Sequence, residues 1–290
     1  MSNNEPKITV THEQLMSDKE GYERLSKILF EKTGIYMDPS EKSISLMSNR
    51  LHKVLKKHFC NSYTEFIQKL DSGNSLILNE FLEVLTTNTT NFFRENEHFI
   101  YLRKNFQKII DYLIKEKRNE IRVWCAASST GEEPYTILMT ILESLAFNPK
   151  FTVKINATDL NTQVLDKAKE GIYKLELTEN IPQELVSKYF EKNQNTTTET
   201  IQIKEKFKKM VEFSKLNLMS DFYSFPYKFD IIFCRNVLIY FPQPIVESTV
   251  LKLSQCLHKE GYLFIGHTES MIGNKDKLKS VHPAIFQLIV

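Results

Sequence analysis

The sequence predicts an α/β fold with a mostly parallel sheet, preceded by a small domain built only of helices. From about residue 121 onward, short apolar runs alternate with longer stretches in which apolar residues recur at helical spacing. This alternation is typical of strands and crossover helices in a parallel sheet that is covered on both faces. The preceding part shows helical spacing alone, broken at Gly34 and Asp38–Pro39. We therefore expect a helical domain over residues 1–85 and an α/β domain over residues 121–290.

Apolar stripes mark the helices of residues 1–85. Their members recur with the period of a helix, so that each stripe falls on one helical face. These faces would bury one another and give this part of the chain a core of its own. The stripes comprise Tyr22, Leu25, Ile28 and Leu29; Leu46, Leu51, Val54 and Leu55; and Phe66, Ile67 and Leu70.

The α/β part contains one segment that departs from the alternation of strands and helices. Within residues 189–212, a polar loop at 193–200 is followed by the alternating pair Ile201 and Ile203. This pattern predicts an inserted hairpin or, alternatively, a solvated surface turn. Elsewhere we expect strands at 121–125, 151–158, 211–216, 229–234, 262–266 and 284–290, and helices at 134–145, 162–170 and 243–257.

Composition excludes several classes of protein. The 290 residues carry a formal net charge of only +2, which does not favour a general nucleic-acid binder. The polar N-terminus lacks a signal peptide, and no apolar run approaches the roughly 20 residues of a membrane helix. We therefore expect a cytoplasmic protein without membrane insertion. The four cysteines are Cys60, Cys125, Cys234 and Cys256. They form no CxxC pair and have no histidines at the spacing of a zinc site, so we expect no metal site.

The loop after the first expected strand is rich in small and acidic residues, among them Gly131, Glu132 and Glu133. Small residues let a ligand approach the backbone closely, whereas two carboxylates at a helix start would repel a pyrophosphate. The loop lacks the GxGxxG fingerprint of a dinucleotide site, and it suits a ligand with an ammonium group or hydroxyls. Alternatively, it is a tight turn whose acidic residues interact favourably with the helix dipole.

Polar residues also follow the second and fourth expected strands. Asp159 ends the second strand, where an acid commonly binds ribose hydroxyls, although it could instead cap the next helix. It follows Gly131 by more than the roughly 20 residues of the dinucleotide fingerprint, which argues against a nicotinamide-dependent oxidoreductase. Arg235 and Asn236 follow the fourth strand and could bind a base edge or a cofactor tail, or satisfy loop backbone.

The segment at residues 86–95 combines polar residues with an adjacent aromatic pair, Phe92 and Phe93. A disordered linker would not carry such a pair. We expect this segment to pack over the α/β domain as a lid, with Arg94 facing the site. The alternative is an ordinary capped helix start.

Together these segments resemble the CheR family, the chemotaxis receptor glutamate methyltransferases. Two runs are specific in combination: Ser-Thr-Gly-Glu-Glu-Pro-Tyr at 129–135, and Phe-Cys-Arg-Asn-Val-Leu-Ile-Tyr-Phe at 233–241. The similarity extends from about residue 18 to residue 290, in the order of the family. Further matching stretches are 86–95, 157–173, 211–218 and 261–270.

The resemblance implies a class I S-adenosylmethionine-dependent methyltransferase domain of Rossmann-like fold, with a small antiparallel β subdomain inserted at about 189–212. A small all-α domain precedes it, and residues 86–120 form a linker and connecting helix that contribute to the cofactor site. The implied activity is methylation of glutamate side-chain carboxylates on chemotaxis receptors for sensory adaptation. S-adenosyl-L-methionine is the implied cofactor and S-adenosyl-L-homocysteine the product. No metal or general base is required, because a glutamate with a pKa of about 4.3 is already ionised at neutral pH.

The resemblance also implies roles for individual residues. Arg94 and Tyr240 would stand nearest the transferred methyl group and act as catalytic residues. Asp159 would bind the ribose, and Asn217 and Leu218 would meet the adenine. The remaining residues implied to contact the cofactor are Asn88, Thr90, Glu133, Arg235 and Asn236, together with Arg94.

The implied partner is the glutamate-rich methylation helix of a receptor. Arg50, Lys53 and Lys57 would lie along one helix face and could steer such a helix, or this face is simply solvated. The hairpin loop at 193–200 is rich in Asn and Thr where some relatives carry glycines. We therefore do not expect it to tether a receptor tail peptide by strand addition. We expect a monomer and no nucleic-acid partner.

Two other classes stay open. The chain could be a binding module of methyltransferase fold without turnover, although the intact run of polar site residues argues against this. It could also be a nucleic-acid methyltransferase. The Asp/Asn-Pro-Pro-aromatic signature of enzymes that methylate amino groups is, however, absent after the fourth expected strand.

Overall fold

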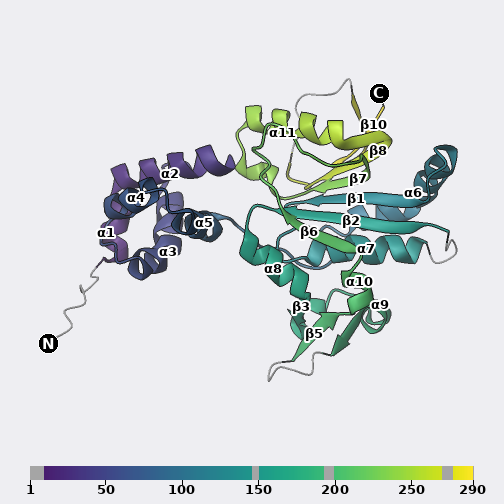
Figure 1. Ribbon diagram of the computed structural model, residues 1–290, viewed down its shortest axis with the longest axis horizontal. Coiled ribbons are helices and arrows are strands. Elements are labelled where there is room, and N and C mark those ends of the chain that lie inside the picture. The colour runs from purple at the N-terminus through teal and green to yellow at the C-terminus, as the bar shows by residue number, and fades with distance from the viewer. Residues whose placement is uncertain (1–9, 146–149, 193–198, 270–276, 290) are drawn as a thin grey trace. The chain divides into compact units, whose positions relative to one another are not determined.

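The computed structural model describes residues 10–145, 150–192, 199–269 and 277–289 (Figure 1). The chain forms two compact units, Met1–Thr87 and Asn88–Val290. In the described parts, no helix combines the length and the apolar character needed to cross a membrane.

The first unit is entirely helical. Its helices begin at polar caps: Thr11, Asp18, Ser40, Ser62 and Asn74 each accept a backbone N–H from the first turn that follows. The expected stripes form its core, with one correction: Leu46 is 40% exposed, because Ile44 and Met47 face the core instead. The helices are α1 (His12–Ser17), α2 (Lys19–Thr33), α3 (Glu41–Lys57), α4 (Tyr63–Asp71) and α5 (Ser75–Leu85).

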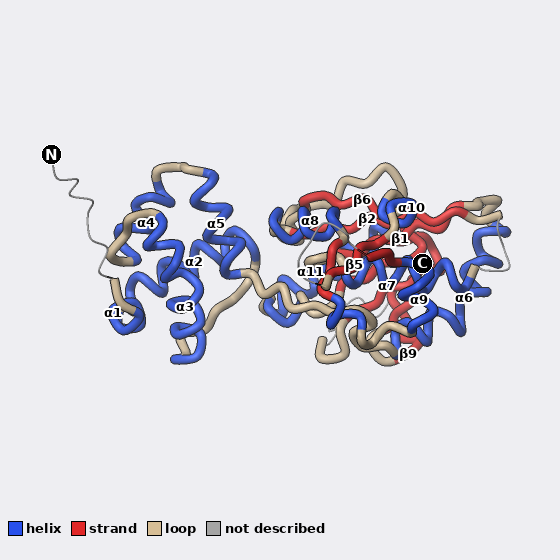
Figure 2. The backbone as a smooth tube through the Cα atoms, turned by 90° about the horizontal axis from the view of Figure 1, so that it is seen from below, coloured by secondary structure: helices blue, strands red, loops and turns tan. Residues whose placement is uncertain are grey.

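The second unit is built on a sheet of order β6-β2-β1-β7-β8-β10-β9. The first five strands of this order run parallel, and β10 pairs antiparallel with both of its neighbours. The tube in Figure 2 shows these strands in red among helices in blue. The strands are β1 (Glu120–Ala126), β2 (Thr152–Asp159), β6 (Val211–Lys215), β7 (Phe229–Cys234), β8 (Leu257–Ile265), β9 (Leu278–His282) and β10 (Ile285–Leu288).

Helices cover both faces of this sheet, as expected for a parallel α/β fold. In β1, the side chains of Val123 and Cys125 join the cluster that includes α6 (Glu97–Lys115) and α7 (Glu132–Ser144). Trp124 and Ala126 point to the opposite cluster, which includes α11 (Gln243–Cys256). Helix α8 (Thr162–Glu170) lies beside β2 and β6.

A small antiparallel sheet of order β3-β5-β4 is inserted between α8 and β6. The expected hairpin corresponds to β4 (Phe190–Lys192) and β5 (Thr200–Ile203), and residues 193–198 of its loop lie outside the described residues. The sequence did not predict β3 (Ile172–Lys174), which pairs with β5 across the sheet. The subdomain also contains η1 (Leu175–Thr178), α9 (Gln183–Tyr189) and α10 (Glu205–Lys208).

Two further differences concern the end of the chain. Strand β8 begins at Leu257, before the expected residue 262. In this added polar stretch only Leu257 pairs with β7, and regular pairing resumes at Tyr262. The last expected strand, 284–290, is shorter than expected, because Ala284 has a φ of 59° in the turn from β9 into β10. A residue in this left-handed conformation cannot continue a strand.

Candidate active site

The candidate site lies where β1, β2, β6 and β7 end, the edge of a parallel sheet at which ligands bind. The loop after β1 is tightly folded: Ala127, Ser129 and Gly131 all have positive φ angles. A Cβ atom at Gly131 would lie 2.8 Å from the Tyr173 hydroxyl oxygen and 2.9 Å from Cβ of Ala168. Glycine is therefore required at this position, both for its φ of 98° and for this close packing.

Asp159 joins the loop after β1 to the loop after β2. Its Oδ2 accepts the backbone N–H of Ser129 at 2.9 Å, and its Oδ1 accepts that of Asn161 at 3.0 Å. Burial raises the pKa of this carboxyl, although the backbone hydrogen bonds oppose the rise. The alternative role as a helix cap is wrong, because Asn161 caps α8 and accepts the N–H groups of Gln163 and Val164.

The segment from Asn88 to Glu95 packs against the second unit, of which it is part. The carbonyl oxygen of Asn88 accepts a hydrogen bond from the Ser129 hydroxyl at 2.8 Å. Phe92 is only 1% exposed and makes edge-to-face contacts with Tyr173 and Phe190 of the small subdomain. The alternative prediction, that this segment is an ordinary capped helix start, is wrong, because α6 begins only at Glu97.

A buried arginine ties this segment to the strand ends. The side chain of Arg235 is 0% exposed. Its Nη1 donates to Oε2 of Glu133 at 2.7 Å, and its Nη2 donates to the carbonyl oxygen of Arg94 at 2.7 Å. Nη2 also lies 3.1 Å from Oε2 of Glu95. We call Arg235, Glu133 and Glu95 the arginine cluster. Breaking such a buried pair from one side costs about 3–5 kcal/mol.

Two neighbours orient Glu95 further. Oε1 accepts Nδ2 of Asn236 at 3.0 Å, and Oε2 accepts the backbone N–H of His267 at 3.1 Å. Burial alone would raise the pKa of Glu95, but the Asn236 hydrogen bond and the Arg235 charge lower it to about 2. The carboxylate is therefore fixed in its charged form. Burial also lowers the pKa of His98 to about 3, which keeps this imidazole neutral.

Glu269 is a buried acid whose role is not predictable from the sequence. It accepts the backbone N–H of Leu238 at 2.7 Å, that of Ile239 at 3.4 Å, and that of Gly266. These bonds hold the turn η2 (Leu238–Tyr240), which carries Tyr240. Nothing in the local sequence distinguishes this acid from a surface glutamate.

The structure brings together only some of the residues that the resemblance implied. Arg94, Glu133, Arg235 and Asn236 belong to one bonded network, and Asn88 and Asp159 both contact Ser129. Nη1 of Arg94 donates to the Thr89 carbonyl at 2.8 Å. Burial raises the pKa of Glu133, and the charges of Arg235 and, to a smaller extent, Arg94 oppose this rise. The partly exposed Thr90 and Tyr240 lie on the Asn88–Glu95 segment and η2 respectively.

Asn217 and Leu218 follow β6 and shape the loop there. Oδ1 of Asn217 accepts the backbone N–H of Met219 at 2.9 Å. The carbonyl oxygen of Leu218 accepts the Tyr223 hydroxyl at 2.8 Å and Nζ of Lys252 at 2.9 Å. The side chain of Leu218 is buried.

The expected basic face is part of the first unit, on α3. Nη1 of Arg50 donates to the carbonyl oxygens of Leu85 and Thr86, so this side chain holds the end of α5. Lys57 forms an ion pair with Glu80 at 2.9 Å. Lys53 is exposed.

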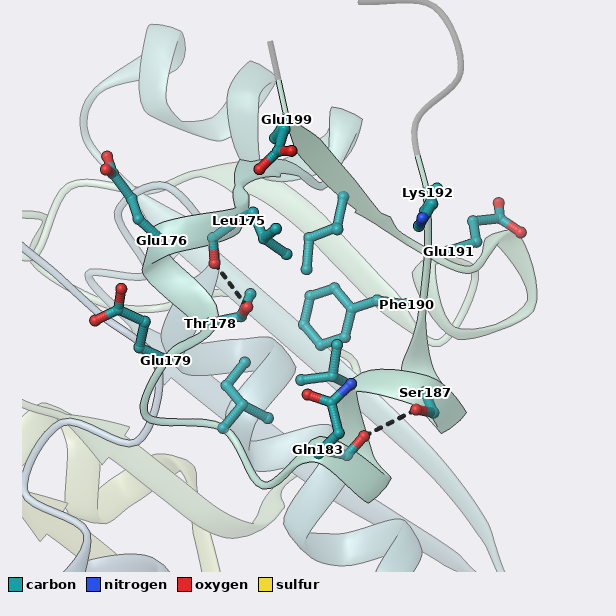
Figure 3. A pocket seen from close by; sticks show the side chains of 13 residues that line it. Leu175, Glu176, Thr178, Glu179, Gln183, Ser187, Phe190, Glu191, Lys192 and Glu199 are labelled. Carbon is teal, nitrogen blue, oxygen red and sulfur yellow. Dashed lines mark hydrogen bonds between the residues drawn. The ribbon is translucent and has the colours of Figure 1, made fainter.

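A separate cavity of about 960 Å³ lies on the small subdomain (Figure 3). It is bounded by η1, α9, β4 and β5, with Phe190 and Ile201 at its apolar floor. Its rim includes Glu176, Glu179, Glu191 and Glu199. None of the residues implied in methyl transfer lines it.

The residues at the strand ends fit S-adenosylmethionine. Carboxylates rather than a glycine-rich phosphate loop surround the first turn, which suits a ligand with an ammonium group and no phosphates. Asp159 remains partly exposed, and its two oxygens accept the backbone N–H groups of Ser129 and Asn161. A carboxylate oxygen can accept a second one, here from a ribose hydroxyl.

Comparison with known proteins identifies the same family in both units. Residues 88–286 match the family model "CheR methyltransferase, SAM binding domain", and residues 20–86 match "CheR methyltransferase, all-alpha domain". The chain is 41% identical to a chemotaxis protein methyltransferase of Borreliella burgdorferi, over 93% of this chain and 94% of the relative. It is 32% identical to chemotaxis protein methyltransferase 2 of Pseudomonas aeruginosa, over 99% of both chains.

A third relative, the chemotaxis protein methyltransferase of Escherichia coli strain K12, is 33% identical over 91% of this chain and 88% of its own length. These matches span both units and include the strand-end loops described above. The chain therefore belongs to the CheR methyltransferase family and is an S-adenosylmethionine-dependent methyltransferase.

Proposed function

We propose that this enzyme methylates glutamate side chains on the cytoplasmic helices of chemotaxis receptors, giving methyl esters for sensory adaptation. One structural observation carries the proposal. The Asn88–Glu95 segment is fixed over the strand ends through Phe92 and the arginine cluster, and it leaves Arg94 partly exposed at this edge. An exposed cation at a methyl-transfer site favours an anionic acceptor such as a carboxylate.

The chemistry demands positioning rather than acid–base catalysis. When bound, the cofactor supplies an electrophilic methyl group: the carboxylate oxygen bonds to the methyl carbon, the carbon–sulfur bond breaks, and S-adenosylhomocysteine leaves. The acceptor is already ionised, so the protein has only to hold it in line. Such positioning contributes up to about 7–11 kcal/mol in favourable cases.

We assign Arg94 to orient the acceptor carboxylate and Tyr240 to donate a hydrogen bond that fixes its oxygen. Asp159 would bind the ribose, Asn217 and Leu218 the adenine, and Asn88 and Thr90 the cofactor from the overlying segment. Arg235 is fully buried, so we give it and Asn236 an indirect role: they position Glu133 and Glu95. Glu133 would then face the cofactor ammonium group.

The direct test is methyl transfer from radiolabelled S-adenosylmethionine to a receptor cytoplasmic fragment. We expect mild base to release the label as methanol, because it hydrolyses esters and leaves methylated amines intact. Tyr240→Phe should lower kcat about tenfold, the effect of one lost hydrogen bond, with unchanged affinity for S-adenosylhomocysteine. Tyr36→Phe changes an exposed tyrosine of the first unit and serves as the control.

Base-stable label would contradict carboxylate methylation. Full turnover by Tyr240→Phe would remove the role given to this hydroxyl while leaving the reaction class intact.

The basic face of α3 supports the proposed receptor partner. Lys53 is exposed, whereas Arg50 and Lys57 make contacts within the first unit, although the Lys57 side chain is also 65% exposed. Lys53→Glu should therefore reduce kcat/KM for receptor methylation severalfold, and more so at low salt, because it reverses a charge that steers an acidic helix. Affinity for S-adenosylhomocysteine, measured by calorimetry, should not change.

Lys27→Glu is the matched control, because Lys27 is also an exposed lysine of the first unit and lies on α2. An equal loss in both variants would indicate a general charge effect rather than a docking face. Because such receptor helices are cytoplasmic, we place the enzyme in the cytoplasm, acting as a monomer. That the 193–200 loop tethers no receptor tail stays a prediction.

A further inference from the structure

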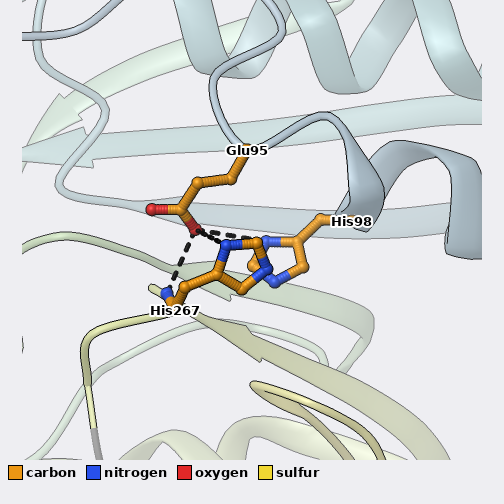
Figure 4. A group of neighbouring side chains, drawn as sticks. All are labelled: Glu95, His98 and His267. Carbon is orange, nitrogen blue, oxygen red and sulfur yellow. Dashed lines mark hydrogen bonds and ion pairs between the residues drawn. The ribbon is translucent and has the colours of Figure 1, made fainter.

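Two histidines converge on Glu95 on the side of the arginine cluster that has no assigned role in methyl transfer. Glu95 lies two residues before the start of α6, His98 lies in the first turn of α6, and His267 follows β8. Figure 4 shows both imidazole rings directed at the same carboxylate. Nδ1 of His98 lies 3.8 Å and Nδ1 of His267 lies 3.5 Å from Oε2 of Glu95.

The spacing of these atoms suits a metal ion. One ligand atom from each of the three residues lies within 4.8 Å of the other two. In a tetrahedral zinc site with bonds of about 2.0–2.1 Å, adjacent ligand atoms are about 3.4 Å apart. The two distances to Glu95 are close to this value, while the three ligand atoms together lie only within 4.8 Å, so binding would require side-chain rotations that draw them closer.

His98 is a buried side chain whose polar atoms lack partners. It is 0% exposed, and neither of its ring nitrogens makes a hydrogen bond among the described residues. A buried polar group left unsatisfied costs about 1–3 kcal/mol, so such groups call for an explanation. A neutral imidazole nitrogen directed at a carboxylate is also the form that binds a metal ion.

The surroundings provide access and orientation. The side chain of His267 is 39% exposed, which leaves an approach from solvent. Asn236 and Arg235 hold the Glu95 carboxylate in place, as outer partners of metal ligands commonly do. Arg235 pairs with both Glu133 and Glu95, so one cation faces two carboxylates and their excess negative charge favours a further cation.

We propose that Glu95, His98 and His267 bind a divalent transition-metal ion of the zinc class, with water as the fourth ligand. Two imidazoles and one carboxylate suit zinc and exclude calcium and magnesium, which prefer oxygen ligands. The site shares Glu95 with the arginine cluster, but its ion would take no part in methyl transfer, and the proposal does not depend on the proposed function.

The test is binding of Zn²⁺ to the full chain, without a histidine tag and after chelator treatment, followed by calorimetry. Co²⁺ serves as a second probe, because its visible absorbance reports tetrahedral coordination. We expect one ion per chain and an intense Co²⁺ band. His267→Ala should weaken Zn²⁺ binding at least about 100-fold, because it removes a direct ligand.

His258→Ala is the control, since His258 lies near the opposite end of β8 and should leave the affinity unchanged. His98→Gln provides a second ligand variant, with folding checked by circular dichroism. Absence of Zn²⁺ binding by the folded wild type would overturn the proposal. So would undiminished binding by His267→Ala, because the ion would then be bound elsewhere.

Discussion

At the residue scale, Asp159 combines a structural and a binding role in one carboxylate. Its oxygens accept backbone N–H groups from Ser129 and Asn161, and the side chain remains partly exposed at the strand ends. The backbone bonds fix the carboxylate before any ligand arrives. A preorganised acceptor of this kind makes a ribose contact stronger, because little side-chain entropy is lost on binding.

Asp159→Asn should therefore raise the Kd for S-adenosylhomocysteine about 10- to 100-fold. The reason is that hydrogen bonds to a charged acceptor contribute about 1.5–3 kcal/mol. Calorimetric titration gives this value directly. Asp166→Asn makes the same change at an exposed position of α8 and should bind normally. Wild-type affinity in both variants would rule out the ribose contact.

The sequence predicted residues at the strand ends better than it predicted their partners. Asp159, Arg235 and Asn236 were found because polar side chains follow buried strands, and this signal is local. The contacts of Arg235 with Glu95 and Glu133 were not foreseen, because each joins segments far apart in the chain. The same reason hid the Glu95–His98–His267 cluster, in which no spacing resembles a metal motif.

At the scale of elements, the parallel strands were predictable and the short strands were not. Strand β7 is buried along its whole length, and its sequence is apolar except for Asp230, which forms an ion pair with Arg118. Strand β3 has only three residues, Ile172–Lys174, with alternating burial that is too short to form a pattern. Strand β9 follows residues 270–276, which lie outside the described residues, and it carries mostly polar residues. Such strands depend on their neighbours for pairing rather than on their own sequence.

Glu143 of α7 connects the small subdomain to the helices that cover the main sheet. Glu143 accepts Nζ of Lys188 at 2.6 Å and the Tyr189 hydroxyl at 2.5 Å, both from α9. Burial raises the pKa of Glu143, but the hydrogen bonds from Lys188 and Tyr189 outweigh it and lower the pKa overall. A carboxyl with a lowered pKa stabilises the fold above its unfolded pKa. This stabilisation disappears as the pH falls through the folded pKa.

Glu143→Gln should thus lower the free energy of unfolding by about 1 kcal/mol at pH 7, and the difference from wild type should shrink as the solution is acidified. Urea titration can follow this through Trp124, the single tryptophan, which is buried in the second unit. Glu184→Gln makes the same change at an exposed position of α9 and serves as the control. A pH-independent difference would show that the ionised form contributes nothing.

At the scale of the whole molecule, we assign cofactor binding and receptor docking to different units. Each has its own buried apolar cluster, and all residues assigned to the cofactor belong to Asn88–Val290. The basic face that we assign to receptor docking belongs instead to Met1–Thr87. This division predicts that cofactor binding and receptor methylation can be separated by truncation.

A fragment of residues 88–290 should fold and bind S-adenosylhomocysteine with a Kd within about threefold of the full chain, because it retains the arginine cluster, Asp159 and the overlying segment. Receptor methylation by this fragment should fall at least about tenfold through KM, since a steering face contributes mainly to encounter. Calorimetry and the labelled-methyl assay measure the two effects on one preparation. A folded fragment that fails to bind S-adenosylhomocysteine would place part of the cofactor site in the helical unit. A fragment that methylates receptors at the full rate would remove the docking role from α3.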